Sequence, residues 1–66
     1  MGKWNRIREI RKERKMTLSD LSEKVGVSIA YLSDIERGNR PGGETLNRIA
    51  DALGVQVSEI ATKEAS

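Results

Sequence analysis

The polar side chains that could carry chemistry in this 66-residue chain are carboxylates, cations, hydroxyls and amides, because it contains neither cysteine nor histidine. Disulfides and the usual zinc sites, which need thiolate or imidazole ligands, are therefore excluded. The carboxylates fall on the polar faces of predicted helices, not around a pocket that so short a chain could enclose. We therefore expect no enzyme activity, no metal, no cofactor and no small-molecule ligand.

Charged side chains are the remaining candidates for a functional role, and they are distributed unevenly along the chain. The net charge is +2, but residues 1–16 contain seven basic and two acidic side chains, which gives +5. Residues 17–37 contain two basic and four acidic side chains, which gives −2. A basic end of this kind suits a polyanion such as a nucleic acid, although a solvated amphipathic helix has the same composition.

Five short helices must position these charges, because apolar residues recur at intervals of three and four, not two. The predicted helices lie at about residues 4–14, between 17 and 26, between 28 and 38, at about 44–53, and around residue 60. We expect one compact all-α domain over residues 1–66, with its core at 4–61 and a frayed tail at 62–66. No apolar run approaches the ~18 residues that span a bilayer, and no signal-peptide core is present, so we expect a cytoplasmic protein with no membrane partner.

Helix ends are marked by capping residues. Thr17, with Asp20 three residues later, forms a capping-box pattern at the start of the second helix, and Gly26 is placed to end that helix in a left-handed conformation. Ser28 is expected to cap the third helix and Ser58 the short fifth helix. The other predicted helix ends are glycines, Gly38 and Gly54.

An apolar stripe on each helix predicts the core. In the first helix we expect Arg11 and Arg14 to continue the inner stripe begun by two isoleucines. For Trp4 we weigh a staple onto the core against a contact with a partner. The residues predicted to face inward are Ile7, Ile10, Leu18, Leu21, Val25, Val27, Tyr31, Leu32, Ile35, Leu46, Ile49, Ala50, Leu53, Val55, Val57 and Ile60, the last three being either core or a dimer seam.

Residues 17–38 form the most informative stretch, two capped helices joined by a turn of three residues. A turn this short makes the helices cross at a steep angle. The second helix buries one face and leaves another bare, and its N-terminus offers free N–H groups to an anion. The side chains on the bare face are Ile29, Ala30, Ser33 and Asp34.

This arrangement resembles the phage-repressor-like (Cro/cI, xenobiotic-response-element) helix-turn-helix family. The resemblance covers residues 7–60 and rests on the segments IREIRKER (7–14), MT (16–17), LSEKVGVS (21–28), YLSDIERG (31–38) and ETLNRIADALGV (44–55). It implies a lambda-repressor-like fold and sequence-specific binding of double-stranded DNA. It also implies a transcriptional regulator, a repressor, that acts as a homodimer on a near-palindromic operator.

The resemblance also implies roles for individual residues. Arg11 and Glu36 correspond to the family's inward-facing ion pair. The base-facing positions are those of Ile29, Ala30, Ser33 and Asp34. The positions near DNA phosphates are those of Thr17, Ser28, Tyr31, Arg37, Asn39 and Arg40, and for Tyr31 packing against the core is the alternative.

Two departures from the family pattern bear on these roles. Leu18 stands where the family often has a phosphate-binding Gln, and the base-facing set contains two apolar residues and one acid. Ile29 and Ala30 can pack on thymine methyl groups, and Asp34 can accept a hydrogen bond from cytosine N4. The same features also suit a protein-interaction module, such as an antitoxin-like or co-regulator partner, and this alternative stays open.

Overall fold

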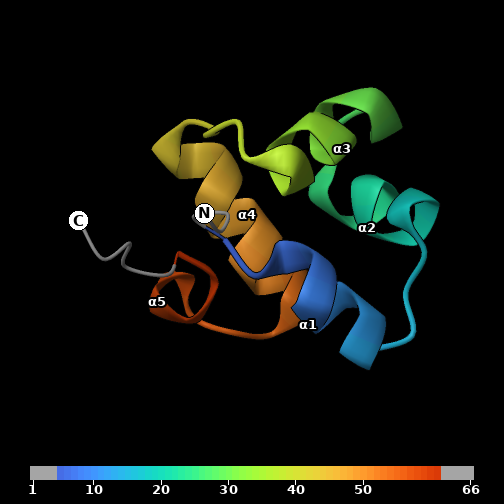
Figure 1. Ribbon diagram of the computed structural model, residues 1–66, viewed down its shortest axis with the longest axis horizontal. Coiled ribbons are helices and arrows are strands. Elements are labelled where there is room, and N and C mark those ends of the chain that lie inside the picture. The colour runs from blue at the N-terminus through green and yellow to red at the C-terminus, as the bar shows by residue number, and fades with distance from the viewer. Residues whose placement is uncertain (1–4, 62–66) are drawn as a thin grey trace.

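The computed structural model describes residues 5–61, and within this range the chain forms five helices and no strand (Figure 1). The predicted all-α fold of five helices is thereby confirmed. Predictions about Trp4 and about the tail at 62–66 lie outside the described residues. The helices are α1 (Ile7–Glu13), α2 (Leu18–Val25), α3 (Ile29–Arg37), α4 (Gly43–Leu53) and α5 (Val57–Ile60).

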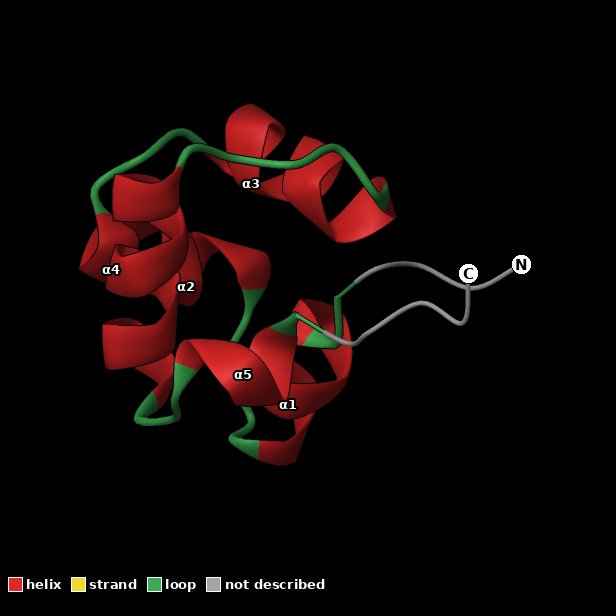
Figure 2. Cartoon of the chain, turned by 90° about the vertical axis from the view of Figure 1, so that its left-hand side faces the viewer, coloured by secondary structure: helices red, strands yellow, loops and turns green. Residues whose placement is uncertain are grey.

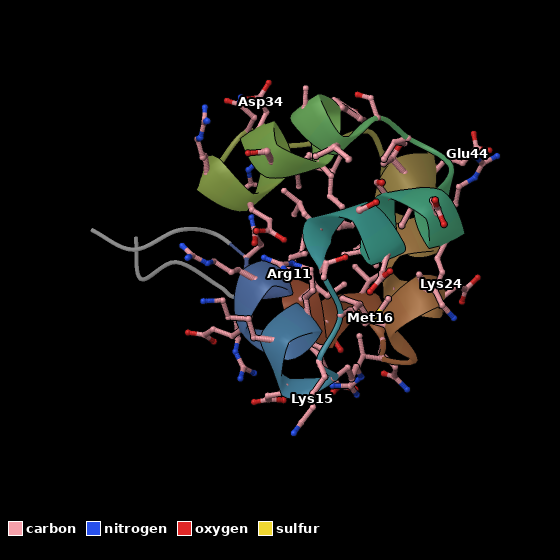
Figure 3. The ribbon with its side chains drawn as sticks, turned by 90° about the vertical axis from the view of Figure 1, so that its right-hand side faces the viewer. Arg11, Lys15, Met16, Lys24, Asp34 and Glu44 are labelled. Atoms are coloured by element: carbon pink, nitrogen blue, oxygen red, sulfur yellow. The ribbon has the colours of Figure 1, made fainter. Side chains whose placement is uncertain are left out.

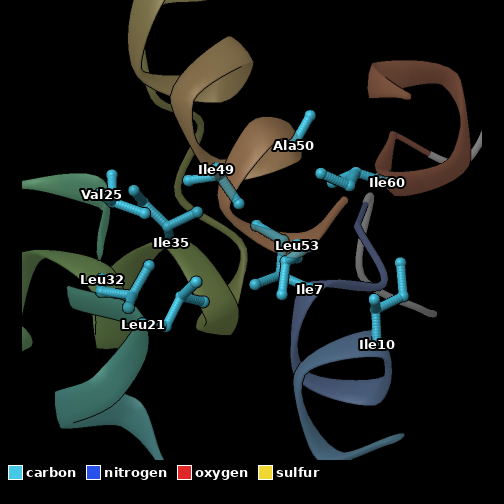
Figure 4. Close-up of a cluster of buried hydrophobic side chains, with 10 residues drawn as sticks. All are labelled: Ile7, Ile10, Leu21, Val25, Leu32, Ile35, Ile49, Ala50, Leu53 and Ile60. Atoms are coloured by element: carbon cyan, nitrogen blue, oxygen red, sulfur yellow. The ribbon is translucent and has the colours of Figure 1, made fainter. Parts of the chain in front are cut away.

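Helix α4 packs against both α2 and α5, and in Figure 1 it runs between the group formed by α2 and α3 and the group formed by α1 and α5. Figure 2 shows α3 at the end of the molecule opposite to α1 and α5. Ile49 and Leu53 of α4 project between the side chains of these two groups (Figure 4). The largest fully buried side chains are Ile7, Leu21, Leu32, Ile35, Ile49 and Ile60. One continuous apolar cluster therefore holds the α2–α3 unit against the rest of the chain.

The first helix begins at Ile7, three residues later than the sequence predicts. The backbone of Asn5 pairs with Ala61 in an isolated antiparallel bridge, and the Arg6 N–H donates to the carbonyl of Ile60 at 3.0 Å. These contacts keep Asn5 outside α1. An apolar stripe in the sequence does not reveal them, because they join the two ends of the described chain.

Three other local predictions are wrong. Arg14 is exposed and does not continue the inner stripe of α1. Tyr31 is 41% exposed, because the buried stripe of α3 is centred on Leu32, Ile35 and Glu36 and leaves residue 31 at its margin. Helix α5 is preceded by Gln56 and not by Ser58, and the Gln56 N–H donates to Glu59 Oε2 at 3.3 Å.

Candidate nucleic-acid interface

The α2–turn–α3 unit has the local geometry that its capping residues predict. Thr17 Oγ1 accepts a hydrogen bond from the Asp20 N–H at 2.9 Å, and Asp20 Oδ2 accepts from the Thr17 N–H at 3.1 Å. Gly26 is left-handed (φ 90°, ψ 30°), which ends α2. Ser28 Oγ accepts from the Tyr31 N–H at 3.1 Å and so caps α3. These bonds satisfy backbone donors that each helix start would otherwise leave without partners.

Small and apolar residues bring α2 and α3 together. Ser22 is buried, and its hydroxyl donates to the Ser19 carbonyl at 2.9 Å, so its polar group is satisfied within α2. Leu21 and Val25 of α2 belong to the same apolar cluster as Leu32 and Ile35 of α3. One side of α3 is thus fixed, and the other is left for solvent or a partner.

The outer side of α3 carries the four predicted base-facing residues. Ile29 is 47% exposed, Ala30 is also exposed, and Ser33 and Asp34 are half-buried. Figure 3 shows Asp34 at the outer edge of α3, away from the core. Its Oδ1 lies 3.4 Å from Arg37 Nη1 in an exposed ion pair. The chain's own atoms therefore leave this side of α3 accessible, with an apolar N-terminal part and a charged C-terminal part.

The six predicted phosphate-contacting residues surround α3 and the start of α2. Thr17 and Ser28 are the N-cap residues of α2 and α3, and Tyr31 lies in the first turn of α3. The other three stand at the C-terminal end of α3 and in the loop to α4. All six are exposed: Thr17, Ser28, Tyr31, Arg37, Asn39 and Arg40.

Behind α3, Arg11 and Glu36 form a buried ion pair. Arg11 Nε lies 2.7 Å from Glu36 Oε2, and Arg11 Nη2 lies 3.2 Å from Glu36 Oε1, so the guanidinium binds the carboxylate at two points. Arg11 Nη1 also donates to the Met16 carbonyl at 2.9 Å. Arg11 thereby joins α1, the α1–α2 connection and the end of α3, and Figure 3 shows its side chain at this junction. The two residues are 9% and 6% exposed, so the pair is structural.

Two residues near α3 were not singled out by the sequence. Arg8 lines a hollow of about 240 Å³ together with Leu18, Ser33 and Arg37, and the buried ion pair lies on its wall. The spacing of Arg8 and Arg11, one turn apart on a helix, was the available signal. Asn5 is buried and bonds to α3, and no local pattern points to this contact, because 30 residues separate the partners.

Part of the positive charge of α1 is neutralised on its own helix. Glu9 Oε1 accepts a hydrogen bond from Arg6 Nε at 3.0 Å, and this bond raises the pKa of the Arg6 guanidinium above its usual value. Arg11 and Arg14 are paired as well, with Glu36 and Glu13, so the exposed positive charge of residues 5–16 rests mainly on Arg8, Lys12 and Lys15.

A cluster of metal ligands and a membrane-spanning helix are both absent from residues 5–61. Between Asn5 and Ala61, no group of three or more acidic, cysteine or histidine side chains is placed to hold a metal ion. None of the five helices combines the length and the apolar character needed to cross a bilayer, within the same range.

Comparison with known proteins identifies the family. A family model described as helix-turn-helix matches residues 7–60. The immunity repressor protein of Bacillus phage phi105 is 52% identical over 60 residues, which cover 89% of this chain and 42% of the repressor. The HTH-type transcriptional regulator DdrOP3 of Deinococcus deserti is 41% identical over 56 residues, which cover 83% of this chain and 43% of that regulator. This chain therefore spans less than half the length of either relative.

Solved structures give the same result. The N-terminal DNA-binding domain of SinR from Bacillus subtilis superposes with a TM-score of 0.79 at 36% identity, covering 92% of this chain and 91% of that one. A crystal structure of SinR in complex with DNA gives a TM-score of 0.73 at 42% identity, over 79% of this chain and 86% of that one. The chain belongs to the phage-repressor-like (Cro/cI-type) helix-turn-helix family of transcription regulators.

Proposed function

We propose that this chain binds double-stranded DNA sequence-specifically and acts as a transcriptional repressor, with α3 in the major groove. The observation that carries the proposal is the accessible outer side of α3, which lies between two capped helix N-termini and an arginine-containing loop. An α-helix fits the major groove, where base edges present distinct hydrogen-bonding patterns. The relatives support this assignment, since one is named a repressor and another was solved with DNA.

Base contacts are assigned to the four outer residues of α3. Ile29 and Ala30 are exposed at the N-terminal part of α3 and suit thymine methyl groups. Ser33 suits hydrogen bonding to a base edge. Asp34 suits cytosine N4 once its exposed pair with Arg37 opens. A set this apolar makes few hydrogen bonds to bases, so contacts with the backbone must supply much of the affinity.

Backbone contacts are assigned to the residues around α3. Thr17 and Ser28 lie at the N-terminal ends of α2 and α3, where free N–H groups and the helix dipoles favour the binding of phosphates. Arg37, Asn39 and Arg40 form a second group at the other end of α3, and Tyr31 offers a hydroxyl between them. Arg8 is added because its side chain and that of Arg37 line one hollow with Leu18, so cations and an apolar surface meet there. A phosphate with its deoxyribose presents the matching combination.

Two copies are assigned to one operator. A single α3 reads only a few base pairs, and members of this structural class reach specificity by placing two such helices about 34 Å apart on a near-palindromic site. If each copy neutralises about three phosphates, the logarithm of the binding constant should fall with the logarithm of salt concentration with a slope of about −5.

Random-site selection followed by a salt titration tests the proposal. The purified chain is expected to enrich a near-palindromic sequence and to bind it with the slope given above. Failure to enrich any DNA, or equal binding to enriched and random DNA, contradicts the proposal and favours the protein-interaction module.

Arg8→Gln tests the hollow, with Lys15→Gln as a control that removes the same charge from the side of the molecule farthest from Asp34 (Figure 3). Arg8→Gln is expected to weaken binding to all sequences equally and to reduce the salt slope by about 1 for each copy bound. Lys15→Gln should leave the slope unchanged. Equal salt slopes for the two variants would show that Arg8 does not contact DNA phosphates.

A further inference from the structure

Asn5 is the residue near α3 that the proposed function leaves without a role. Its side chain is almost fully buried, with 7% of the residue exposed, and it stands outside every helix. Asn5 Nδ2 donates to the carbonyl of Ile35 at 2.9 Å, and Asn5 Oδ1 accepts from the Ile7 N–H at 3.0 Å. One short side chain therefore joins the start of α1 to the last turn of α3.

The partners fix which way the amide group faces. The Ile7 N–H can only donate and the Ile35 carbonyl can only accept, so the oxygen must face Ile7 and the nitrogen must face Ile35. The backbone next to this side chain is held separately, through the bridge of Asn5 with Ala61 and the Arg6-to-Ile60 hydrogen bond of 3.0 Å. These backbone contacts fix the position of Asn5 independently of its hydrogen bond to α3.

The acceptor lies where α3 is least constrained by its own hydrogen bonds. The last carbonyls of a helix have no intrahelical partner. The Ile35 carbonyl accepts from the Gly38 N–H at 3.0 Å and from Asn5, and the adjacent residue Glu36 is held by Arg11 at 2.7 Å. Two polar groups from outside α3 therefore hold consecutive residues on its inner side.

We propose that Asn5 is a positioning residue for DNA reading: through the Ile35 carbonyl it sets the rotation of α3 and thereby the aim of its outer side chains. This inference rests on the proposed function. With side chains about 5 Å from the helix axis, a rotation of roughly 20° moves a side-chain end by nearly 2 Å, which breaks a hydrogen bond or contact to a base edge. Flexible side chains that bind phosphates tolerate a shift of that size better. A rotated α3 is therefore expected to discriminate less between operator and random DNA while keeping most of its affinity for DNA.

Asn5→Ser separates the two bonds of Asn5. The serine hydroxyl can still accept from the Ile7 N–H, as in a local turn, but it is too short to reach Ile35. Ile10→Val is the matched control, because it removes one buried methylene-sized group from α1 and leaves the Asn5 and Arg11 side chains unchanged. Figure 4 shows Ile10 on the side of the apolar cluster away from Leu32 and Ile35 of α3. Both variants are compared with the unchanged chain well below their unfolding temperatures.

Two measurements decide the inference. In Asn5→Ser, the amide hydrogen exchange rates of Gly38 and Asn39 are expected to rise about tenfold more than the exchange rates of the α4 amides. In Ile10→Val, the exchange rates of all protected amides should rise by the same factor. The ratio of Kd for random DNA to Kd for the selected operator is expected to fall about tenfold in Asn5→Ser and to stay within about twofold in Ile10→Val.

The outcomes distinguish this inference from the proposed function. An unchanged ratio, or exchange that rises evenly along the chain in Asn5→Ser, overturns the positioning role. If the unchanged chain does not discriminate between operator and random DNA, the proposed function fails and the role of Asn5 in DNA reading fails with it. The exchange data then still show whether Asn5 holds the end of α3.

Discussion

At the scale of single residues, the molecule depends on buried polar side chains that are hydrogen-bonded to other parts of the chain. Arg11 uses all three of its nitrogen atoms, two on Glu36 and one on the Met16 carbonyl. Asn5 likewise uses both its donor and its acceptor group. Such groups contribute little when complete, but removing one partner leaves the other desolvated without compensation.

Glu36→Ala is therefore expected to lower the free energy of unfolding by about 3–5 kcal/mol, because Arg11 stays buried without its carboxylate. The exposed pair between Glu44 and Arg48, at 3.1 Å, provides the control: Glu44→Ala should cost no more than about 1 kcal/mol. Denaturant unfolding measures both. Since a 66-residue chain has little stability to lose, Arg11→Met/Glu36→Leu is included and should be more stable than Glu36→Ala. Equal costs for Glu36→Ala and Glu44→Ala would show that the buried pair is solvated.

Lys15 carries a second residue-level prediction, because it is the one described non-glycine residue with a positive φ, at 57°. A side chain in this left-handed conformation costs roughly 1 kcal/mol, which glycine avoids in part. Lys15→Gly is expected to raise the free energy of unfolding by about 0.5–1 kcal/mol, whereas Lys12→Gly, inside α1, should lower it by about 1 kcal/mol. If thermal unfolding shows both variants destabilised, the backbone at Lys15 is not strained.

At the scale of elements, capping residues made the α2–turn–α3 unit predictable. Thr17, Gly26 and Ser28 have the conformations and hydrogen bonds expected of them, since caps act within three residues of their own position. The start of α1 was predicted wrongly for the opposite reason, because Asn5 is held by a hydrogen bond to a residue 30 positions away. The cap of α5 was predicted wrongly because two local candidates compete, Ser58 and the pair of Gln56 with Glu59, and the spacing of apolar residues does not distinguish them.

Two substitutions of Ser28 distinguish its contribution to stability from its contribution to DNA binding. Ser28→Ala should destabilise the chain by about 1 kcal/mol, because the Tyr31 N–H loses its acceptor, whereas Ser28→Asp keeps the cap and should be as stable as the unchanged chain. Near a phosphate the added carboxylate is repelled, so Ser28→Asp is expected to bind DNA roughly tenfold or more weakly. Thermal unfolding and DNA titration are run on the same samples. Full binding by Ser28→Asp would place the N-terminus of α3 away from phosphates.

At the scale of the whole molecule, one small core has to hold the α2–α3 unit at a fixed angle to the rest. Most of that core was predictable from helical spacing, and its central part is Ile49 and Leu53 of α4, between the two groups of helices (Figure 4). The accessible side of α3 was predictable as well, because Ile29 and Ala30 fall outside the buried stripe. What spacing could not predict is the set of contacts that joins distant segments, namely the bridge between Asn5 and Ala61 and the hollow beside Arg8.

Ile49→Ala is expected to lower the free energy of unfolding by about 2–5 kcal/mol and to leave unfolding a single transition, because Ile49 is completely buried between both groups. Ile49→Val should cost about 0.5–1.5 kcal/mol. Circular dichroism at increasing denaturant concentration, together with amide exchange of α1 and α3, measures this. Separate transitions for α1 and α3 would show that the two groups do not share one core.

The account centres on the outer side of α3 reading base edges, and paired random-site selections test this most directly. The unchanged chain is expected to enrich two half-sites with centres about one helical turn apart. Ala30→Gln replaces a methyl group with an amide that pairs with adenine N6 and N7, so it should change the selected base at one symmetric position towards adenine and leave the other positions unchanged. Identical enriched sequences for the two chains, or no enrichment by either, would contradict the account.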